Sequence, residues 1–369
     1  MSREISLVGK EPLVRISKRD TISRAKAYRF RLVAVILSLV VCAMVIVAIT
    51  RQNPVKVYLG IIDGAVGTNR RLWVTIRDAL TLLIIAVGLT PAFRMKFWNI
   101  GAEGQVLMGG AAAAAVMIYL GEALPNWLLL LVITLASGLA GSIWGLLPAI
   151  FKAYNNTNET LFTLMMNYVA MQFVTFCIVF WENPTGSNTV GMINAATKKG
   201  WFPKLWGTNY GLNIIIVLSI TLGVYLYMKY SKQGYEIAVV GESKFTARYV
   251  GIKVNKVILR TMMISGAICG IAGTIIVSGA SHTISTSTAG GRGFTAIIVT
   301  WMSRFNPVAM IVVSLFLVFM QQGAIQIASQ YGLNENASDI ITGIILFFLI
   351  GCEFFIQYKL DFHKHKKEA

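Results

Sequence analysis

Long stretches without a charged residue constrain this chain more than any other feature. A helix needs roughly 20 apolar residues to cross a bilayer, and runs of that order recur along the 369 residues: Leu32 to Ile49, Gly104 to Gly121, Ala123 to Phe151, Thr160 to Trp181, Leu205 to Met228 and Phe305 to Asn334. Hydrophobic residues make up 56% of the chain and charged residues 13%. Most of the chain is therefore expected to lie in lipid.

We predict an all-α multi-pass membrane protein with about ten transmembrane helices. The expected spans cover roughly residues 30–50, 78–94, 99–120, 127–151, 160–181, 210–229, 261–281, 284–303, 306–328 and 338–358. A basic cytoplasmic segment, 1–30, precedes the transmembrane domain, 31–358, and a cytoplasmic tail, 359–369, follows it. Two loops are long enough to carry structure of their own: an outer loop, 182–209, and a cytoplasmic loop, 229–260.

The net charge of +17 follows the membrane topology rather than indicating a nucleic-acid partner. With the amino terminus inside, the cytoplasmic segments carry 24 of the 33 Lys and Arg residues, as the positive-inside rule requires. Both termini are then cytoplasmic and the number of crossings is even. The basic leader is too long for an ordinary signal peptide, so the first span is expected to be uncleaved.

Two places depart from a continuous helix. The second span contains Pro91 and runs directly into FWNIGAEGQVLMGG, residues 97–110, while the eighth span is interrupted by GGRGF, residues 290–294. If spans two to five and seven to ten are repeats, the two breaks correspond, and the repeats are inverted in topology. Paired interruptions in inverted halves are a sequence indicator of a transport site near the membrane midplane.

The first break has an unusual density of polar residues and glycines, and two readings of it stay open. Irregular backbone at membrane depth is tolerated where it faces protein or a wet cavity, so the motif is typical of a polar pathway lining. In that reading Glu103 needs a partner, with Arg94, Lys96 or Arg292 as candidates. In the other reading, the glycines serve helix packing and Glu103 caps a helix end.

Two further polar stretches accompany the breaks. Thr160, Thr163 and Asn167 share one face of the fifth span, as a pathway lining or a set of interhelical hydrogen bonds would require. Beside the second break lie His282, Thr283, Ser285, Thr286 and Ser287. For the histidine alone, a position in an outer loop is the simpler explanation.

The cytoplasmic loop predicts a short helix between Gly241 and Gly251. Ser243 suits the N-cap position and Gly251 the position after the C-cap. A two-turn helix is too short to be stable alone in water, so it must dock on something. Phe245, Tyr249 and Val250 provide an apolar face for a protein partner or for anionic lipid headgroups. The sequence has no GxxxxGK[ST] phosphate loop, so any use of ATP must come from a partner.

Four stretches together resemble the permease subunits of ABC importers for nucleosides, a group that also includes permeases for ribose-type sugars and branched-chain amino acids. They are FWNIGAEGQ (97–105), ETLFTLMMNYVA (159–170), VVGESKFTARYVGI (239–252) and GGRGFTAIIVTWMSRFNP (290–307). The resemblance covers most of the chain from about residue 75 onward. Glu242, Ser243 and Thr246 depart from the pattern usual in such loops, where Asn and a pair of alanines stand.

The resemblance implies a transport subunit of the bacterial cytoplasmic membrane, not an enzyme. It would pair with a second homologous permease, receive substrate from a binding lipoprotein and be driven by a cytoplasmic ATPase that holds ATP and Mg²⁺; the chain itself would bind no cofactor or metal. The short helix would contact the ATPase through Gly241, Glu242, Phe245, Ala247, Arg248, Tyr249 and Gly251.

A nucleoside is neutral, with a flat base and a hydroxyl-rich sugar, and its path needs amides, hydroxyls and ring faces. The expected pathway residues are Trp98, Asn99, Glu103, Gln105, Thr163, Asn167 and Phe294. An importer for simple sugars or branched-chain amino acids is the alternative within the same class. A secondary transporter is the alternative from another class, and Glu103 and Glu353 are the acids best placed to serve it.

Overall fold

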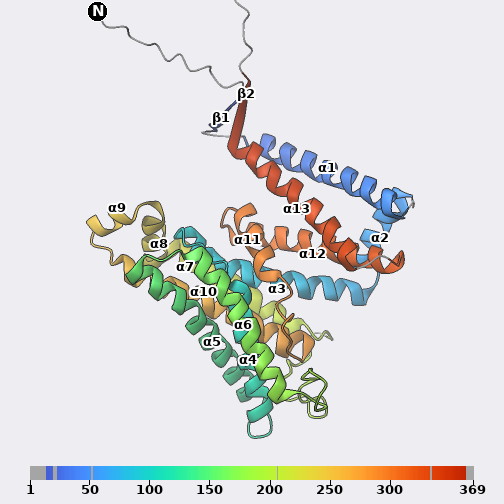
Figure 1. The fold of residues 1–369 in the computed structure, drawn as a ribbon, viewed down its shortest axis with the longest axis vertical. Helices are drawn as coiled ribbons and strands as arrows, with labels where there is room; N and C mark the ends of the chain where they lie inside the picture. The colour runs from blue at the N-terminus through green and yellow to red at the C-terminus, as the bar shows by residue number, and fades with distance from the viewer. Residues whose placement is uncertain (1–13, 20–22, 51–52, 206, 333–334, 363–369) are drawn as a thin grey trace, which may run out of the picture. The chain divides into compact units, whose positions relative to one another are not determined.

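The computed structural model describes residues 14–19, 23–50, 53–205, 207–332 and 335–362. Helices dominate these segments, which confirms the predicted class, and one short two-stranded sheet accompanies them (Figure 1). The chain divides into two compact units: Met1–Gly64 together with Gly323–Ala369, and Ala65–Gln322. Each unit is described by itself.

The first unit joins the two ends of the chain. Its helices α1 (Arg24–Thr50) and α13 (Glu335–Gln357) lie side by side, and Phe30 packs on Ala34, Cys352 and Ile356 between them (Figure 1). Strand β1 (Val14–Lys18) pairs antiparallel with β2 (Tyr358–Phe362). These strands were not predicted. Their pairing brings residues 14–18 beside residues 358–362.

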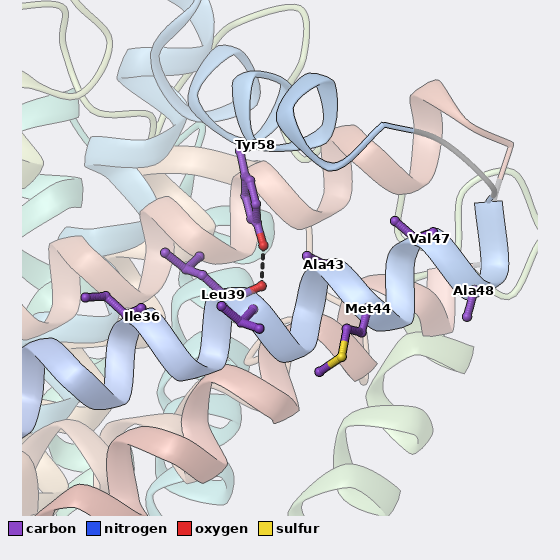
Figure 2. A pocket seen from close by; sticks show the side chains of 8 residues that line it. Ile36, Leu39, Ala43, Met44, Val47, Ala48 and Tyr58 are labelled. Atoms are coloured by element: carbon purple, nitrogen blue, oxygen red, sulfur yellow. Dashed lines mark hydrogen bonds between the residues drawn. The ribbon is translucent and has the colours of Figure 1, made fainter.

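Helix α2 (Pro54–Val66) was also not predicted; it lies between the predicted spans 30–50 and 78–94. An apolar groove of about 570 Å³ runs along α1 up to Tyr58 of α2, and Figure 2 shows the side chains that line it. The Tyr58 hydroxyl donates to the Leu39 carbonyl. The remaining lining side chains are aliphatic or Met, so this groove has no group that would recognise a polar solute.

The second unit contains the segments singled out by the sequence. Its elements are α3 (Asn69–Arg94), α4 (Ala102–Leu120), α5 (Asn126–Asn155), α6 (Glu159–Trp181), α7 (Gly211–Tyr230), α8 (Lys232–Glu242), α9 (Lys244–Tyr249), α10 (Val254–Ile276), the π-helical turn η1 (Val277–Ser281), α11 (Arg292–Met302) and α12 (Pro307–Gln330), the last of which continues into the first unit. Helix α10 and η1 form the core of this unit, since 78% of the residues in their apolar stretch are buried.

Glycines allow α10 to approach its neighbours at backbone distance. A Cβ atom added to Gly109 on α4 would lie 2.2 Å from the carbonyl oxygen of Gly270, and one added to Gly141 on α5 would lie 2.2 Å from that of Gly266. Such contacts leave no space for a side chain, as is common where membrane helices pack closely. For Gly109 the packing reading of the first motif is therefore correct.

The predicted spans agree with the observed helices in most places. Among the described residues, seven helices are long and apolar enough to cross a membrane, and Ile340–Ile356 is a shorter apolar stretch; a total of ten spans stays a prediction, as does the inverted repeat. Both interruptions are confirmed. The eighth predicted span, 284–303, was too long, because only Arg292–Met302 is helical there.

Replacing Gly270 by Ala is expected to lower the stability of the protein, because its new Cβ would lie 2.1 Å from the Ser137 carbonyl oxygen. We expect a loss of about 1–3 kcal/mol, measured as a lower melting temperature of the purified protein in detergent. Gly223→Ala is the matched control, since no atom lies within 4 Å of its added Cβ. Equal melting temperatures for the two variants would contradict the close packing.

Candidate functional site

The first break, residues 95–101, is stabilised by side chains of α6. The Ile100 N–H donates to Thr163 Oγ1 at 3.1 Å, and the Ile100 carbonyl accepts from Asn167 Nδ2 at 3.0 Å. Asn167 Oδ1 also accepts from the Gly104 N–H at 2.8 Å. Thr163 and Asn167 are buried, so the hydrogen bonds replace those that a continuous helix would have made. Their helical spacing, noted in the sequence, thus serves interhelical bonding.

Asn99 and Gln105 form a buried amide pair at the start of α4. Asn99 Nδ2 donates to Gln105 Oε1 at 3.3 Å, Gln105 Nε2 donates back to Asn99 Oδ1 at 3.3 Å, and Ser265 Oγ on α10 accepts from Asn99 Nδ2 at 3.4 Å. Asn99 Oδ1 also accepts from the Gly101 N–H at 3.0 Å. The pair therefore connects the first break to the core helix, and both side chains are at most 1% exposed.

Glu103 joins the two breaks. Its carboxylate oxygens accept from the backbone N–H groups of Gly291 and Gly293, both at 2.7 Å, so it caps the first turn of α11. A negative charge is favourable there because the N-terminus of a helix carries unsatisfied N–H groups and a partial positive charge. A Cβ on Gly293 would lie 2.5 Å from the Glu103 nitrogen, so the two helix starts are in direct backbone contact.

The capping reading of Glu103 is therefore the one the structure supports, with a difference in detail. The capped helix is α11, and not the helix that carries the glutamate. In the described structure the carboxylate is bonded to backbone N–H groups, whereas Arg292, one of its candidate partners, pairs with Asp78 at 3.3 Å. The sequence motif GGRGF supplies this arrangement because Gly290 and Gly291 adopt positive φ angles of 60° and 71°.

Asp78 is a charged centre that the sequence reading missed. It is 6% exposed and accepts hydrogen bonds from Arg77 Nε at 2.8 Å and from Gln322 Nε2 at 2.8 Å, in addition to the ion pair with Arg292. In the sequence, Arg77 and Asp78 stand directly before an apolar run and mark the start of the predicted span 78–94. A buried carboxylate needs such partners because desolvation of a lone charge is costly.

A polar cavity of about 230 Å³ lies between this charged centre and the second break. Hydroxyl side chains dominate its wall. The lining residues are Arg77, Asp78, Thr81, Ile276, Ala280, Ser281, Thr283, Ser285, Ser287, Thr288 and Arg292. Thr283, Ser285 and Ser287 belong to the third polar stretch noted in the sequence. The cavity therefore offers hydroxyl and guanidinium groups to a polar solute.

An exposed group of aromatic rings lies where the first break meets the end of α11. Trp98 stacks on Trp301 with 5.3 Å between ring centroids and an interplanar angle of 20°, and Phe93 contacts both rings at 6.0 Å. Trp98 and Trp301 are 45% and 41% exposed, so their outer faces are free for contact. Phe294, 44% exposed, lies two turns before Trp301 on the same face of α11.

The outer loop packs on the second break. The Ile193 N–H donates to the His282 carbonyl at 2.8 Å, and the Trp201 ring stacks on His282 with 3.7 Å between centroids. His282 has a positive φ of 53° at the end of η1. Burial lowers its pKa below the ordinary value, which favours the neutral ring that stacks here. His282 thus lies in the connection between η1 and α11, packed on residues of the 182–209 loop, and its place on the outer side of the membrane stays a prediction.

The predicted short helix of the cytoplasmic loop is confirmed as α9. Ser243 is its N-cap, with Oγ accepting from the Thr246 N–H at 3.2 Å, and Gly251 follows the C-cap with a φ of 82°. Phe245 and Tyr249 are 82% and 87% exposed. Large apolar side chains displayed on so short a helix indicate a surface that another molecule covers. Burial lowers the pKa of Lys244, the first residue of α9, and the positive charge of Lys152 lowers this pKa further.

Helix α8, which was not predicted, connects α9 to the first break. Gly241, near its end, packs on the end of α3: an added Cβ would lie 2.2 Å from the Arg94 carbonyl oxygen. Arg94 is the last residue of α3, directly before the first break. Figure 1 shows α9 projecting beyond α8 at this end of the unit. A displacement of α9 would therefore reach the break through backbone contacts.

These features define a class of protein. Broken helices that meet inside a helical membrane unit, beside a polar cavity and a short helix with exposed aromatic rings, are the structural elements of a membrane transport component. Residues 72–350 match the family described as the branched-chain amino acid transport system permease component, and the chain belongs to this family. It is therefore a membrane permease.

The proteins to which the chain is similar are named for the transport of different substrates. The chain is 28% identical to the guanosine ABC transporter permease protein NupP of Bacillus subtilis over 86% of its length and 91% of that protein. It is 25% identical to the nucleoside ABC transporter permease protein NupB of Lactococcus lactis, over 89% and 92%. It is 24% identical to the glucose ABC transporter permease protein TsgB13 of Haloferax volcanii, over 94% and 93%.

Glu103→Ala is expected to destabilise the protein, because the N–H groups of Gly291 and Gly293 lose their acceptors. Hydrogen bonds to a charged group contribute about 1.5–3 kcal/mol each, so the melting temperature should fall clearly, and Glu103→Gln should retain part of the stability through its one carbonyl oxygen. Glu122→Ala, at an exposed loop position, is the control. If both alanine variants melt alike, the carboxylate does not cap α11.

Proposed function

We propose that this permease is the transmembrane subunit of an ATP-driven importer that moves nucleosides into the cell by alternating access. The observation that carries the proposal is the pair of relatives named for guanosine and nucleoside transport, each matched over more than nine-tenths of its own length. The family match, residues 72–350, includes both breaks and α9.

The chemistry of the unit supports a neutral, polar and aromatic substrate. The cavity at the second break presents Ser285, Ser287 and Thr288, and hydroxyls of this kind can bond a ribose. The stacked Trp98 and Trp301 expose ring faces of the kind on which a flat base packs. We propose a pathway that involves Trp98, Asn99, Glu103, Gln105, Thr163, Asn167 and Phe294. The buried members among these would act by fixing the backbone of the two breaks.

The importer would be assembled from several chains. A second homologous permease would complete the passage, a binding lipoprotein would deliver the substrate, and a cytoplasmic ABC ATPase would hold ATP and Mg²⁺, so that this chain needs no cofactor of its own. The permease would lie in the bacterial cytoplasmic membrane with both termini in the cytoplasm. ATP binding would move α9 and switch access through differential stability of the outward-open and inward-open states.

We propose that the ATPase contacts α9 and its flanks. The exposed rings of Phe245 and Tyr249 suit the apolar part of such an interface, and Glu242 and Arg248 its charged rim. Ala247 lies on the buried face of α9. Gly251, with its positive φ, allows the turn from α9 into α10. Gly241, packed on Arg94, would pass the movement to the first break.

A sugar importer is the second candidate, favoured by the similarity to the glucose permease of Haloferax volcanii. A branched-chain amino acid importer follows from the family description. An ion-coupled transporter has less support: Glu103 already caps α11, and the side chain of Glu353 lies outside the described residues.

The substrate class is tested by uptake into proteoliposomes that contain the purified complex with ATP inside. We expect labelled guanosine to accumulate, unlabelled nucleosides to compete, and glucose and leucine to have no effect. Uptake should persist with proton and sodium ionophores present. Competition by glucose or leucine alone, or loss of uptake with ionophores, would overturn the proposal. Asn167→Ala and Asn99→Ala should each reduce uptake about tenfold or more, because each removes at least two hydrogen bonds at the first break.

Tyr249→Asp is expected to reduce the stimulation of ATPase activity by substrate-loaded binding protein about tenfold or more, because a charge would enter the centre of an aromatic contact. Arg248→Glu should act in the same direction. Tyr249→Phe, which retains the ring, should keep the stimulation. Unchanged stimulation in the Tyr249→Asp complex would instead indicate that α9 rests on lipid headgroups.

A further inference from the structure

A second polar cavity lies on the cytoplasmic side of the second unit, away from the two breaks. It measures about 380 Å³ and is formed by α8, by the connection from α9 to α10, and by the first two turns of α10. This volume is many times the ~30 Å³ that one water molecule occupies in the liquid, so the cavity can accept a small polyatomic group. Of the residues assigned above to the pathway and to the ATPase contact, only Gly251 is among its described lining residues.

The wall of this cavity is strongly basic. Lys232, Lys253, Lys256 and Arg260 line it, and Glu236 is the one acid among its described lining residues. Glu236 is already paired with Arg260, whose Nη2 lies 2.9 Å from Oε2. Three exposed lysines therefore remain around one cavity without a counter-charge in its wall. Like charges gathered in this way repel one another, and a bound anion would relieve the repulsion.

The backbone adds donors to the same place. Lys253 is the N-cap of α10, and its side chain accepts no hydrogen bond from the helix. The first N–H groups of a helix have no partner within the helix, and the first intrahelical bond recorded for α10 is that of the Val257 N–H to the Lys253 carbonyl at 3.1 Å. The start of the 23-residue α10 thus lies at the cavity that Lys232, Lys253 and Lys256 line. An anion is favoured there by the helix dipole and by the ammonium groups together.

We propose that this cavity binds a phosphate group, either the headgroup phosphate of an anionic membrane lipid or a soluble phosphate. Lysines bind phosphate as mobile point charges, each with several N–H donors, and the helix start supplies fixed donors. The bound phosphate bridges Lys232 of α8 and Lys253 and Lys256 of α10. It therefore braces the base of α9, which lies between these two helices in the chain.

The test uses the purified transporter complex in nanodiscs, with two arms that separate the sources. In the first arm, nanodiscs contain phosphatidylcholine with a fraction of phosphatidylglycerol, and native mass spectrometry records the retained phosphatidylglycerol. In the second arm, inorganic phosphate is titrated against the complex in pure phosphatidylcholine, with chloride at equal ionic strength as the reference, and calorimetry records its binding.

The double variant Lys253→Gln/Lys256→Gln is expected to weaken binding about 30-fold, because each basic residue near an anionic surface contributes about a fivefold factor. Lys96→Gln/Lys229→Gln removes the same charge elsewhere and should bind as the wild type does. Lys253→Arg/Lys256→Arg should restore binding, which separates loss of charge from loss of folding. Retention of phosphatidylglycerol identifies a lipid source, and calorimetric binding of phosphate identifies a soluble one. The proposal is overturned if neither binds, or if the cavity variant and the Lys96/Lys229 variant lose binding equally.

Discussion

The requirement that every backbone N–H and C=O at membrane depth find a partner governs this structure. At the first break the partners are side chains: Thr163 and Asn167 bond the backbone around Ile100, and Asn99 bonds the N–H of Gly101. At the second break the partner is Glu103. Thr163, Asn167 and Glu103 come from parts of the chain distant from the backbone they bond, whereas Asn99 lies two residues from Gly101.

Glu103 makes the two breaks one structural element. Its backbone lies in the first turn of α4, and its carboxylate accepts hydrogen bonds from the N–H groups at the start of α11. Neither helix start can therefore move without affecting the other. Gly293 permits the contact because a side chain there would collide with Glu103. Gly241 of α8 packs at backbone distance on the end of α3, directly before the first break. A continuous path of rigid contacts therefore leads from the displayed α9 to the junction of the two breaks.

In the second unit, the closely packed core and the polar cavities lie in different places. The glycines of α4 and α5 meet those of α10 at distances that exclude side chains, which produces a closely packed core. Polar groups that are accessible lie at the edges of this core, in the hydroxyl-rich cavity beside Asp78 and in the basic cavity beside α8. The amides Asn99 and Gln105, which the sequence assigned to a pathway lining, are at most 1% exposed and belong to the core.

The helical membrane class, the positions of both breaks, and α9 with its cap at Ser243 could be predicted from the sequence, because hydropathy, glycine content and capping are local properties of the chain. The partners of individual groups could not: that Glu103 caps α11, that Arg292 pairs with Asp78, and that β1 pairs with β2 became visible only in the folded chain. These contacts join residues 188 to 190 positions apart at Glu103 and more than 200 apart elsewhere. Composition and spacing carry no record of such pairs, since any of several cations or helix ends would satisfy a buried acid equally well in the sequence.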